Sequence, residues 1–275
     1  MNNLEQARVQ LGPSGFDKVL VAMAAAADAA RLQTLPRFRT GVSIENKSAR
    51  GFDPVTEADR EAERAIRAVL EAHFPDHGII GEEFGVHDAD ADFVWAIDPI
   101  DGTRSFIAGV PMWGTLIGLL YRGKSIAGLM DQPFTGERFV ATPDGGAFLR
   151  GDERRPLKTS GCTRLEEARI FTTTPKMFHP GTQQNAWEAV EADALQTRYG
   201  CDCYAYCLVA AGHGDLVMEA NLNVYDIAAL VPIVEAAGGV IRSFDGGPPD
   251  GGGDVIAAAT TELYEAARRA IAARP

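Results

Sequence analysis

The sequence has little histidine and cysteine, and this scarcity excludes several kinds of catalytic and metal centre. The 275 residues include 5 histidines and 4 cysteines. There is no His-Glu-x-x-His segment and no Gly-x-Ser-x-Gly segment, so a zinc protease or a serine hydrolase of these patterns is not expected. Cys201, Cys203 and Cys207 cluster while Cys162 stands apart, a spacing that matches no standard zinc framework. We therefore expect buried, reduced thiols.

Basic residues and long apolar runs are also scarce. Lysine and arginine total 26 against 38 aspartates and glutamates, a formal net charge of -12. This surplus of acids disfavours nucleic acid as a partner and suits the binding of cations. The longest stretch of low polarity, "LVAMAAAADAA", is too short to span a bilayer, and the N-terminus has no basic segment leading into an apolar one. We expect a cytoplasmic protein with no membrane partner.

Periodic patterns divide the chain into two parts. A helix is expected at residues 16–35 and another after Thr56, its expected N-cap. Strand-like runs follow, among them a hairpin at 138–151 with its turn at 144–146. After about residue 155, strands and helices alternate, and one continuous helix is expected from Asp226. We predict an α/β protein with an N-terminal α+β part at 1–152 and a C-terminal α/β part at 153–275.

Acidic residues stand at the ends of predicted elements, where ligands bind in open α/β sheets. In "WAIDPIDGTRSF", Asp98 and Asp101 follow an apolar strand and precede a helix, whose first amides offer an anion site. Two carboxylates this close repel each other unless a cation or a donor satisfies them. Oxygen ligands of this kind are those that Mg²⁺ prefers. The pair therefore predicts a site that can hold a hard divalent cation beside a phosphate.

Simpler explanations exist for other acids. Asp59 can complete a capping box with Thr56, and Asp226 can cap the helix that it begins. The segment "DADAD" at 88–92 resembles the start of a calcium loop, but Phe93 and Pro99 stand where such a loop needs glycine and glutamate, so a solvated loop is expected.

Four segments in order give a specific resemblance. "DPVTEAD" at 53–59, "GEE" at 81–83, "DPIDGT" at 98–103 and "YDIAAL" at 225–230 resemble the signatures of the inositol monophosphatase superfamily of Mg²⁺-dependent phosphatases. The resemblance implies a layered αβαβα fold, a homodimer, two to three Mg²⁺ per site, and direct attack on phosphorus by a metal-bound water. One position departs from the pattern, because Tyr225 stands where the family often has tryptophan.

The resemblance also implies roles for individual residues. Those implied to bind the metals are Glu82, Asp98, the backbone carbonyl of Ile100, Asp101 and Asp226. Thr103 and Glu82 would orient the attacking water, and Asp59 would support the metals through water. The amides of Gly102 and Thr103 would hold the phosphate.

Within the superfamily, "GTRSFIAGVPMWGTLIGLL", "RYGCDCYAY" and "VMEANLNVYD" look most like the histidinol-phosphatase branch, with Arg104 and Ser105 after Gly-Thr. A leaving alcohol that carries an ammonium and an imidazole would be matched by acids at Asp202 and Glu219, although either could be a surface or capping acid. The expected substrate-binding residues are Asp101, Gly102, Thr103, Arg104, Asp202, Glu219 and Asp226.

The function predicted from the sequence is thus a Mg²⁺-dependent histidinol-phosphate phosphatase of histidine biosynthesis, acting on a small phosphorylated substrate. The alternatives within the same chemistry are an inositol-1-monophosphatase and a 3'-phosphoadenosine 5'-phosphate phosphatase. A haloacid-dehalogenase phosphatase is disfavoured, because it would use Asp-x-Asp rather than Asp-x-x-Asp. From a different class, a catalytically silent metal-binding regulatory protein could keep the fold, but the intact set of acids argues against it.

Overall fold

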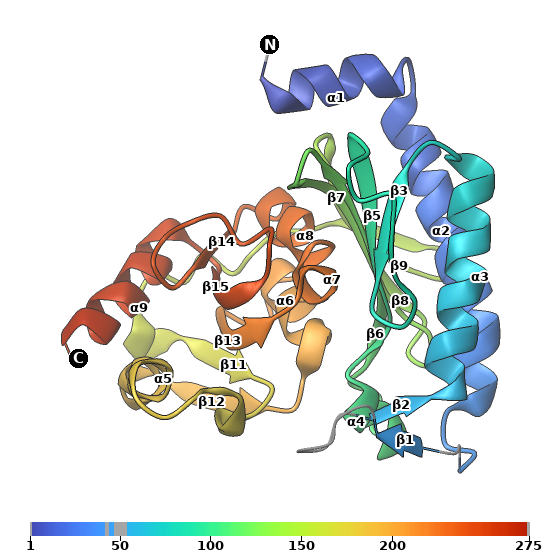
Figure 1. Ribbon diagram of the computed structural model, residues 1–275. Coiled ribbons are helices and arrows are strands. Elements are labelled where there is room, and N and C mark those ends of the chain that lie inside the picture. The colour runs from blue at the N-terminus through green and yellow to red at the C-terminus, as the bar shows by residue number, and fades with distance from the viewer. Residues whose placement is uncertain (1, 42–43, 47–53, 274–275) are drawn as a thin grey trace.

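Two β-sheets, each covered by helices, organise the part of the chain that the computed structural model describes, residues 2–41, 44–46 and 54–273 (Figure 1). The α-helices are α1 (Asn3–Leu11), α2 (Gly15–Thr34), α3 (Glu57–His73), α4 (Thr103–Ile107), α5 (Thr182–Asp193), α6 (Asp202–Ala210), α7 (Val224–Ile227), α8 (Leu230–Ala236) and α9 (Thr261–Ala273). Short 3₁₀ helices are η1 (Leu35–Arg37), η2 (Leu165–Glu167) and η3 (Pro175–Met177).

The larger sheet has eight strands in the order β10-β9-β8-β7-β6-β5-β3-β4, and its neighbours are antiparallel except for β3 and β5. Its strands are β3 (Gly78–Gly81), β4 (Gly85–His87), β5 (Phe93–Asp101), β6 (Gly114–Tyr121), β7 (Lys124–Gln132), β8 (Glu137–Thr142), β9 (Gly145–Arg150) and β10 (Glu153–Pro156). A separate pair, β1 (Ile44–Asn46) and β2 (Pro54–Thr56), precedes α3. Asp53 of the "DPVTEAD" segment lies outside the described residues.

The smaller sheet has five strands in the order β12-β11-β13-β15-β14, with β11 parallel to both of its neighbours. Its strands are β11 (Arg169–Thr172), β12 (Gln196–Tyr199), β13 (Leu216–Leu222), β14 (Val240–Ser243) and β15 (Gly253–Ala258). The carboxyl ends of parallel strands meet at one edge of a sheet, so the residues that follow β11 and β12 lie near each other.

The layers visible in Figure 1 are each held together by a cluster of buried apolar side chains. Buried residues of α2 and α3 pack on one face of the larger sheet. Helices α6 and α8 fill the space between the two sheets, and α5 and α9 pack on the outer face of the smaller sheet. The order of layers is therefore α-β-α-β-α, which confirms the predicted fold class.

Helix α3 shows why the local predictions succeed. Thr56 is its N-cap, and Thr56 and Asp59 form the expected capping box. Ala62, Ile66 and Leu70 recur every fourth residue and are fully buried against the core. The helix is thus fixed at its start by hydrogen bonds and along its length by one apolar face.

Three local predictions need correction. The hairpin turn lies at Pro143 and Asp144, because Thr142 already pairs with Gly145. The helix expected from Asp226 is interrupted at Ala228 and Ala229, between α7 and α8. Pro232, in the first turn of α8, has no amide hydrogen to donate to the carbonyl of Ala228. All four cysteines are free, but Cys162 and Cys201 are only half-buried.

The larger sheet continues past the boundary placed near residue 152, since β10 pairs with β9 as far as Pro156. The division into two parts stays a prediction. Within the described residues, no helix combines the length and the apolar character that crossing a membrane requires.

Candidate active site

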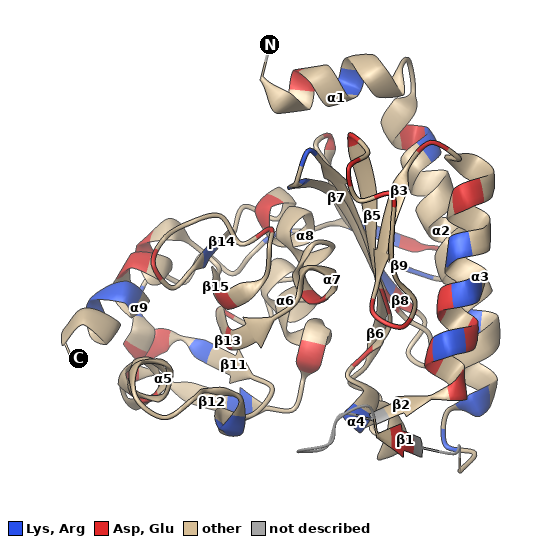
Figure 2. Ribbon diagram, viewed as in Figure 1, with Lys and Arg blue, Asp and Glu red and all other residues tan. Residues whose placement is uncertain are grey.

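A cleft of about 390 Å³ lies where the ends of β5 and β13 approach the starts of α4, α6 and α7. Figure 2 shows acidic segments at the start of α6 and in α7, on the side that faces the larger sheet. Every residue proposed above for the site lines this cleft, with the exception of Asp59. The lining residues are Glu82, Asp98, Ile100, Asp101, Gly102, Thr103, Arg104, Thr173, Met177, Asp202, Glu219, Leu222, Asn223, Tyr225 and Asp226.

Strand β5 contributes Asp98 and Asp101 through an irregularity in its pairing with β6. Asp98 pairs with Leu116 and Asp101 with Gly114, so the register shifts between the two acids. The amide of Ile100 donates to Oδ1 of Asp98 at 3.0 Å, which holds that carboxylate against the strand. The two acids therefore lie at the end of a buried strand rather than on a free turn.

Asp226 reaches the cleft from the first turn of α7. The N-cap of this helix is Asn223, and Asp226 is the third helical residue, so Asp226 does not begin the helix and takes part in its capping from the first turn. The amide of Asn223 donates to Oδ2 of Asp226 at 2.6 Å, which completes a capping box. The capping bond uses one carboxylate oxygen, and the side chain still lines the cleft.

Asp98, Asp101 and Asp226 form one acidic cluster, with an oxygen of each lying within 4.8 Å of the others. Burial and the charges of Glu82, Asp101 and Asp226 raise the pKa of Asp98. Burial, followed by Asp202 and Asp226, raises the pKa of Asp101. Burial raises the pKa of Asp226 to about 7. Mutual repulsion among buried carboxylates is what a divalent cation relieves, so this donor set fits Mg²⁺.

Glu82 follows β3 and lines the same cleft. Its amide donates to the carbonyl of Ile97 at 3.2 Å, which continues the pairing of β3 with β5. The turn after it is held by Glu63 of α3, whose carboxylate accepts from the amides of Glu83 at 2.7 Å and Phe84 at 3.2 Å. Helix α3 thus fixes the segment that places Glu82 beside the acidic cluster.

Thr103 connects the cleft to Asp59. Its hydroxyl lies 3.1 Å from the carbonyl of Ile100 and 3.4 Å from Oδ1 of Asp59. Oδ2 of Asp59 accepts from the amide of Thr56 at 2.8 Å and from its hydroxyl at 2.5 Å. Burial raises the pKa of Asp59 to about 6, although the Thr56 hydrogen bonds oppose this rise. Asp59 lies behind Thr103 and acts both as a cap and as its hydrogen-bond partner.

Asp202 and Glu219 also line the cleft. Asp202 starts α6 with a left-handed φ of 45° and accepts from the Ser105 hydroxyl at 2.9 Å. Burial raises its pKa, while Ser105, Thr173 and the charge of Arg104 oppose the rise. Asp202 therefore contacts the start of α4 through Ser105 and feels the charge of Arg104 there.

Glu219 is almost completely buried in β13, and its carboxylate is well supplied with donors. Oε1 accepts from the amide of Thr173 at 3.0 Å and from its hydroxyl at 2.5 Å, and Oε2 accepts from the Tyr206 hydroxyl at 3.0 Å. Burial raises the pKa of Glu219 to about 7. Asp202 is the less enclosed of the two acids.

Gly102 joins β5 to α4 with a φ of 83°. A Cβ at this position would lie 2.8 Å from the carbonyl oxygen of Met112, so the close approach needs glycine. The roles of Gly102 and Thr103 in phosphate binding stay predictions.

Sequence reasoning missed the supporting residues Thr173 and Tyr206. Thr173 directly follows β11, a parallel strand, and the rule that ligands bind at the carboxyl ends of such strands could have found it. Tyr206 carries no such signal, because its pairing with Glu219 depends on how α6 packs on β13.

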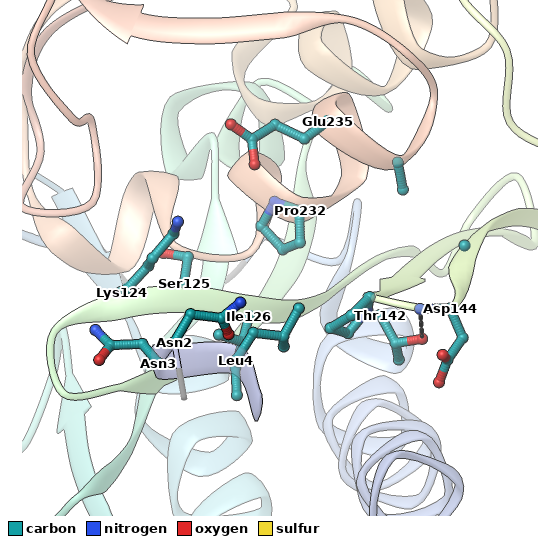
Figure 3. A pocket seen from close by; sticks show the side chains of 13 residues that line it. Asn2, Asn3, Leu4, Lys124, Ser125, Ile126, Thr142, Asp144, Pro232 and Glu235 are labelled. Atoms are coloured by element: carbon teal, nitrogen blue, oxygen red, sulfur yellow. Dashed lines mark hydrogen bonds between the residues drawn. The ribbon is translucent and has the colours of Figure 1, made fainter. Parts of the chain in front are cut away.

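A second cavity, of about 670 Å³, lies between α1, the start of β7, the β8–β9 turn and α8 (Figure 3). Leu4, Ile126 and Pro232 give it an apolar wall, and Lys124 and Glu235 lie at its rim. Among the described residues, three side chains close enough to share a metal ion occur in the first cleft, as Asp98, Asp101 and Asp226. The first cleft is therefore the candidate active site.

The fold and the acidic cleft together define a metal-dependent phosphomonoesterase. A model described as the inositol monophosphatase family matches residues 16–274, and the chain belongs to this family. It is 41% identical over 239 residues, covering 86% of this chain and 67% of the relative, to a chloroplastic bifunctional phosphatase, IMPL2, from Arabidopsis thaliana. It is 37% identical over 204 residues, covering 74% and 78%, to a histidinol-phosphatase from Chlorobaculum parvum. The structure of an inositol monophosphatase from Zymomonas mobilis matches with a TM-score of 0.83 and 38% identity, covering 95% of this chain and 99% of that one.

Proposed function

We propose that this protein is a Mg²⁺-dependent histidinol-phosphate phosphatase of histidine biosynthesis. The observation that carries the proposal is the composition of the cleft. An acidic cluster at the end of β5 shares the cleft with a second pair of acids, Asp202 and Glu219. The first group suits a cation and a phosphate, and Asp202, the less enclosed acid of the pair, suits a leaving alcohol with positive charge. The similarity to a histidinol-phosphatase supports the same substrate.

Each acid has a proposed part in the reaction. Asp98, Asp101, Asp226, Glu82 and the carbonyl of Ile100 would hold the metal. Bound Mg²⁺ would supply a Lewis acid, which lowers the pKa of water and neutralises charge on phosphate oxygens. We also propose that the amides of Gly102 and Thr103 bind the phosphate.

Thr103 and Glu82 would orient the attacking water. The Thr103 hydroxyl already has acceptors in the carbonyl of Ile100 and the carboxylate of Asp59, so its lone pairs can receive a hydrogen bond from water. Asp59 keeps Thr103 in this orientation from the start of α3. The water would attack phosphorus directly, because none of the described serines, cysteines and aspartates of the cleft is paired with a base as a nucleophile would be.

Two measurements test this reaction. Hydrolysis of a stereochemically defined thiophosphate ester in ¹⁸O-labelled water should invert the configuration at phosphorus. Retention would contradict the direct attack, because it requires two displacements. Activity should also disappear when Mg²⁺ is removed and return when it is restored.

The nearest alternative is an inositol-1-monophosphatase, which the 38% identity to the Zymomonas mobilis structure favours. A panel with L-histidinol phosphate, inositol 1-phosphate and 3'-phosphoadenosine 5'-phosphate distinguishes the candidates. We expect kcat/KM for L-histidinol phosphate to exceed that for inositol 1-phosphate by about two orders of magnitude. Equal values would reject the substrate assignment and leave the phosphatase activity in place.

A further inference from the structure

The irregularity in β5 has a single residue of β6 opposite it. Asp98 pairs with Leu116 and Asp101 pairs with Gly114, so Pro99 and Ile100 face Thr115 alone. A bulge of this kind leaves backbone groups without their ladder partners. Pro99 in addition has no amide hydrogen, so it cannot anchor the bulge as a donor.

Thr115 supplies the missing anchor. Its hydroxyl donates to the carbonyl of Pro99 at 2.8 Å, and both groups are buried. Thr115 is fully buried and does not line the cleft. The bond therefore satisfies a buried carbonyl at the back of the site, away from substrate and metal.

The anchored peptide lies between the acidic side chains. Directly after Pro99, the Ile100 amide holds Oδ1 of Asp98 at 3.0 Å, and the Ile100 carbonyl accepts from Thr103 at 3.1 Å. A shift of the Pro99 carbonyl would move this peptide and change the spacing of the carboxylates before and after it. A valine at position 115 would keep the size of the side chain and remove the donor.

We propose that Thr115 is a positioning residue of the metal site, whose hydroxyl fixes the bulge so that the oxygens of Asp98, Ile100 and Asp101 converge. This inference rests on the proposed function of the acidic cluster in binding Mg²⁺. If Thr115 only filled space in the core, the loss of its hydroxyl would change stability and leave metal affinity the same. As a positioning residue, it should change metal affinity.

The test compares Thr115→Val with Thr115→Ser and with a control, Thr34→Val. Thr34 is equally buried, and its hydroxyl has no hydrogen-bond partner among the described residues, so its loss breaks no bond. Binding of Mn²⁺ to the metal-free protein, followed by electron paramagnetic resonance, reports the affinity without catalysis. The Mg²⁺ concentration for half-maximal activity gives a second readout.

We expect Thr115→Val to weaken Mn²⁺ binding at least about fivefold and to raise the half-saturating Mg²⁺ concentration similarly. Thr115→Ser and Thr34→Val should stay within about twofold of the wild type. If Thr115→Val does not fold, Thr115→Ala against Thr115→Ser isolates the same hydroxyl, and weaker binding by the alanine variant supports the proposal. If the folded valine or alanine variant binds Mn²⁺ as tightly as Thr115→Ser, the proposal is overturned, whatever happens to the unfolding temperature.

Asp98→Asn in the same Mn²⁺ experiment separates this inference from the proposed function. If Asp98→Asn binds Mn²⁺ like the wild type, the metal assignment itself is wrong and the role of Thr115 falls with it. If Asp98→Asn binds weakly while Thr115→Val binds normally, only the role of Thr115 is wrong.

Discussion

The backbone amide of Cys203 donates to Oδ2 of Asp101 at 2.7 Å, across a separation of 102 residues in the chain. Asp101 ends β5 of the larger sheet, and Cys203 lies in the first turn of α6, between the sheets. This hydrogen bond favours the charged form of Asp101 and partly opposes the rise in its pKa that burial and Asp202 cause. An acid of the cluster on β5 is therefore held by the first turn of α6.

Replacing one acid of the cluster should separate activity from stability. We expect Asp98→Asn to lower kcat/KM by more than about a hundredfold, which is the upper cost of losing an outer partner of a metal ligand. Without Mg²⁺, the unfolding temperature should stay the same or rise, because the variant has less buried repulsion. Asp90→Asn, in an exposed loop, is the matched control and should change neither quantity. Near-normal turnover of Asp98→Asn at saturating Mg²⁺ would be incompatible with a metal ligand.

The Thr103 hydroxyl should matter for turnover more than for substrate affinity. Thr103→Val removes the donor to Ile100 and Asp59 and, in the proposed reaction, the acceptor for the attacking water. We expect kcat to fall by about a hundredfold with little change in KM, and Thr103→Ser to recover most of it. Steady-state kinetics at saturating Mg²⁺ checks this. A serine variant as inactive as the valine variant would show that the methyl group, and not the hydroxyl, is required.

Without metal, the protein should lose stability as pH rises from about 4 to about 7. Burial raises the pKa of Asp59 to about 6 and those of Asp226 and Glu219 to about 7, above the value of about 4 for an unfolded chain. In this window the folded chain binds more protons than the unfolded chain, so the free energy of unfolding falls with rising pH. His77 acts in the opposite sense up to about pH 6.5, because burial lowers its pKa to about 4.

His77 lies outside the cleft, so it contributes equally to the unfolding temperature with and without Mg²⁺. The difference between these two temperatures at one pH therefore reports the cleft alone. Since the cation binds ionised carboxylates, this difference should grow from about pH 5 to about pH 8. Thermal unfolding in EDTA and in Mg²⁺ at each pH measures it. A difference that stays constant over this range would contradict ligands with raised pKa values.

Glu63 should contribute to stability far more than its neighbour Glu61. The Glu63 side chain is fully buried, pairs with Arg67 at 2.7 Å, and accepts the amides of Glu83 and Phe84. We expect Glu63→Leu to cost about 3–5 kcal/mol, because it removes the acceptor of two amides and the ion-pair partner of Arg67, which keeps only the carbonyl of Gly85 among the described residues. Glu61→Gln disturbs an exposed pair with Arg64 on the same helix and should cost less than about 1 kcal/mol. Urea unfolding of both variants tests the difference, and similar losses would contradict it.

The sequence predicts what depends on local pattern and on recognised motifs. The Thr56–Asp59 capping box follows from short-range spacing, and the acids of the cluster follow from their places at element ends. The anchors of the site do not follow. Thr115 reads as one more residue of an apolar strand, and its partner is known only once the register of β5 and β6 is known.

The same limit applies to the cap of α7 and to the surroundings of Glu219. Asn223 and Asp226 both suit a helix start, and only the path of the chain after β13 decides which of them is the cap. Glu219 accepts hydrogen bonds from Thr173, which follows β11, and from Tyr206 of α6. The sequence alone does not show that these elements meet. Tertiary packing therefore decides which of the two acids stays open to a ligand.

The last prediction concerns the choice of substrate, and Asp202 is the residue that tests it. Its φ of 45° is one that asparagine also adopts readily, and the Ser105 hydroxyl can donate to an amide oxygen, so Asp202→Asn removes charge with little strain. A charge-assisted hydrogen bond to a cationic leaving group contributes about 1.5–3 kcal/mol, which is about a ten- to hundredfold effect. We therefore expect Asp202→Asn to lower kcat/KM for L-histidinol phosphate at least about tenfold, and that for inositol 1-phosphate less than about threefold. Glu219→Gln should instead lower both values together, because its carboxylate organises Thr173 and Tyr206. Equal losses for the two substrates in Asp202→Asn would show that this acid shapes the cleft and does not recognise positive charge.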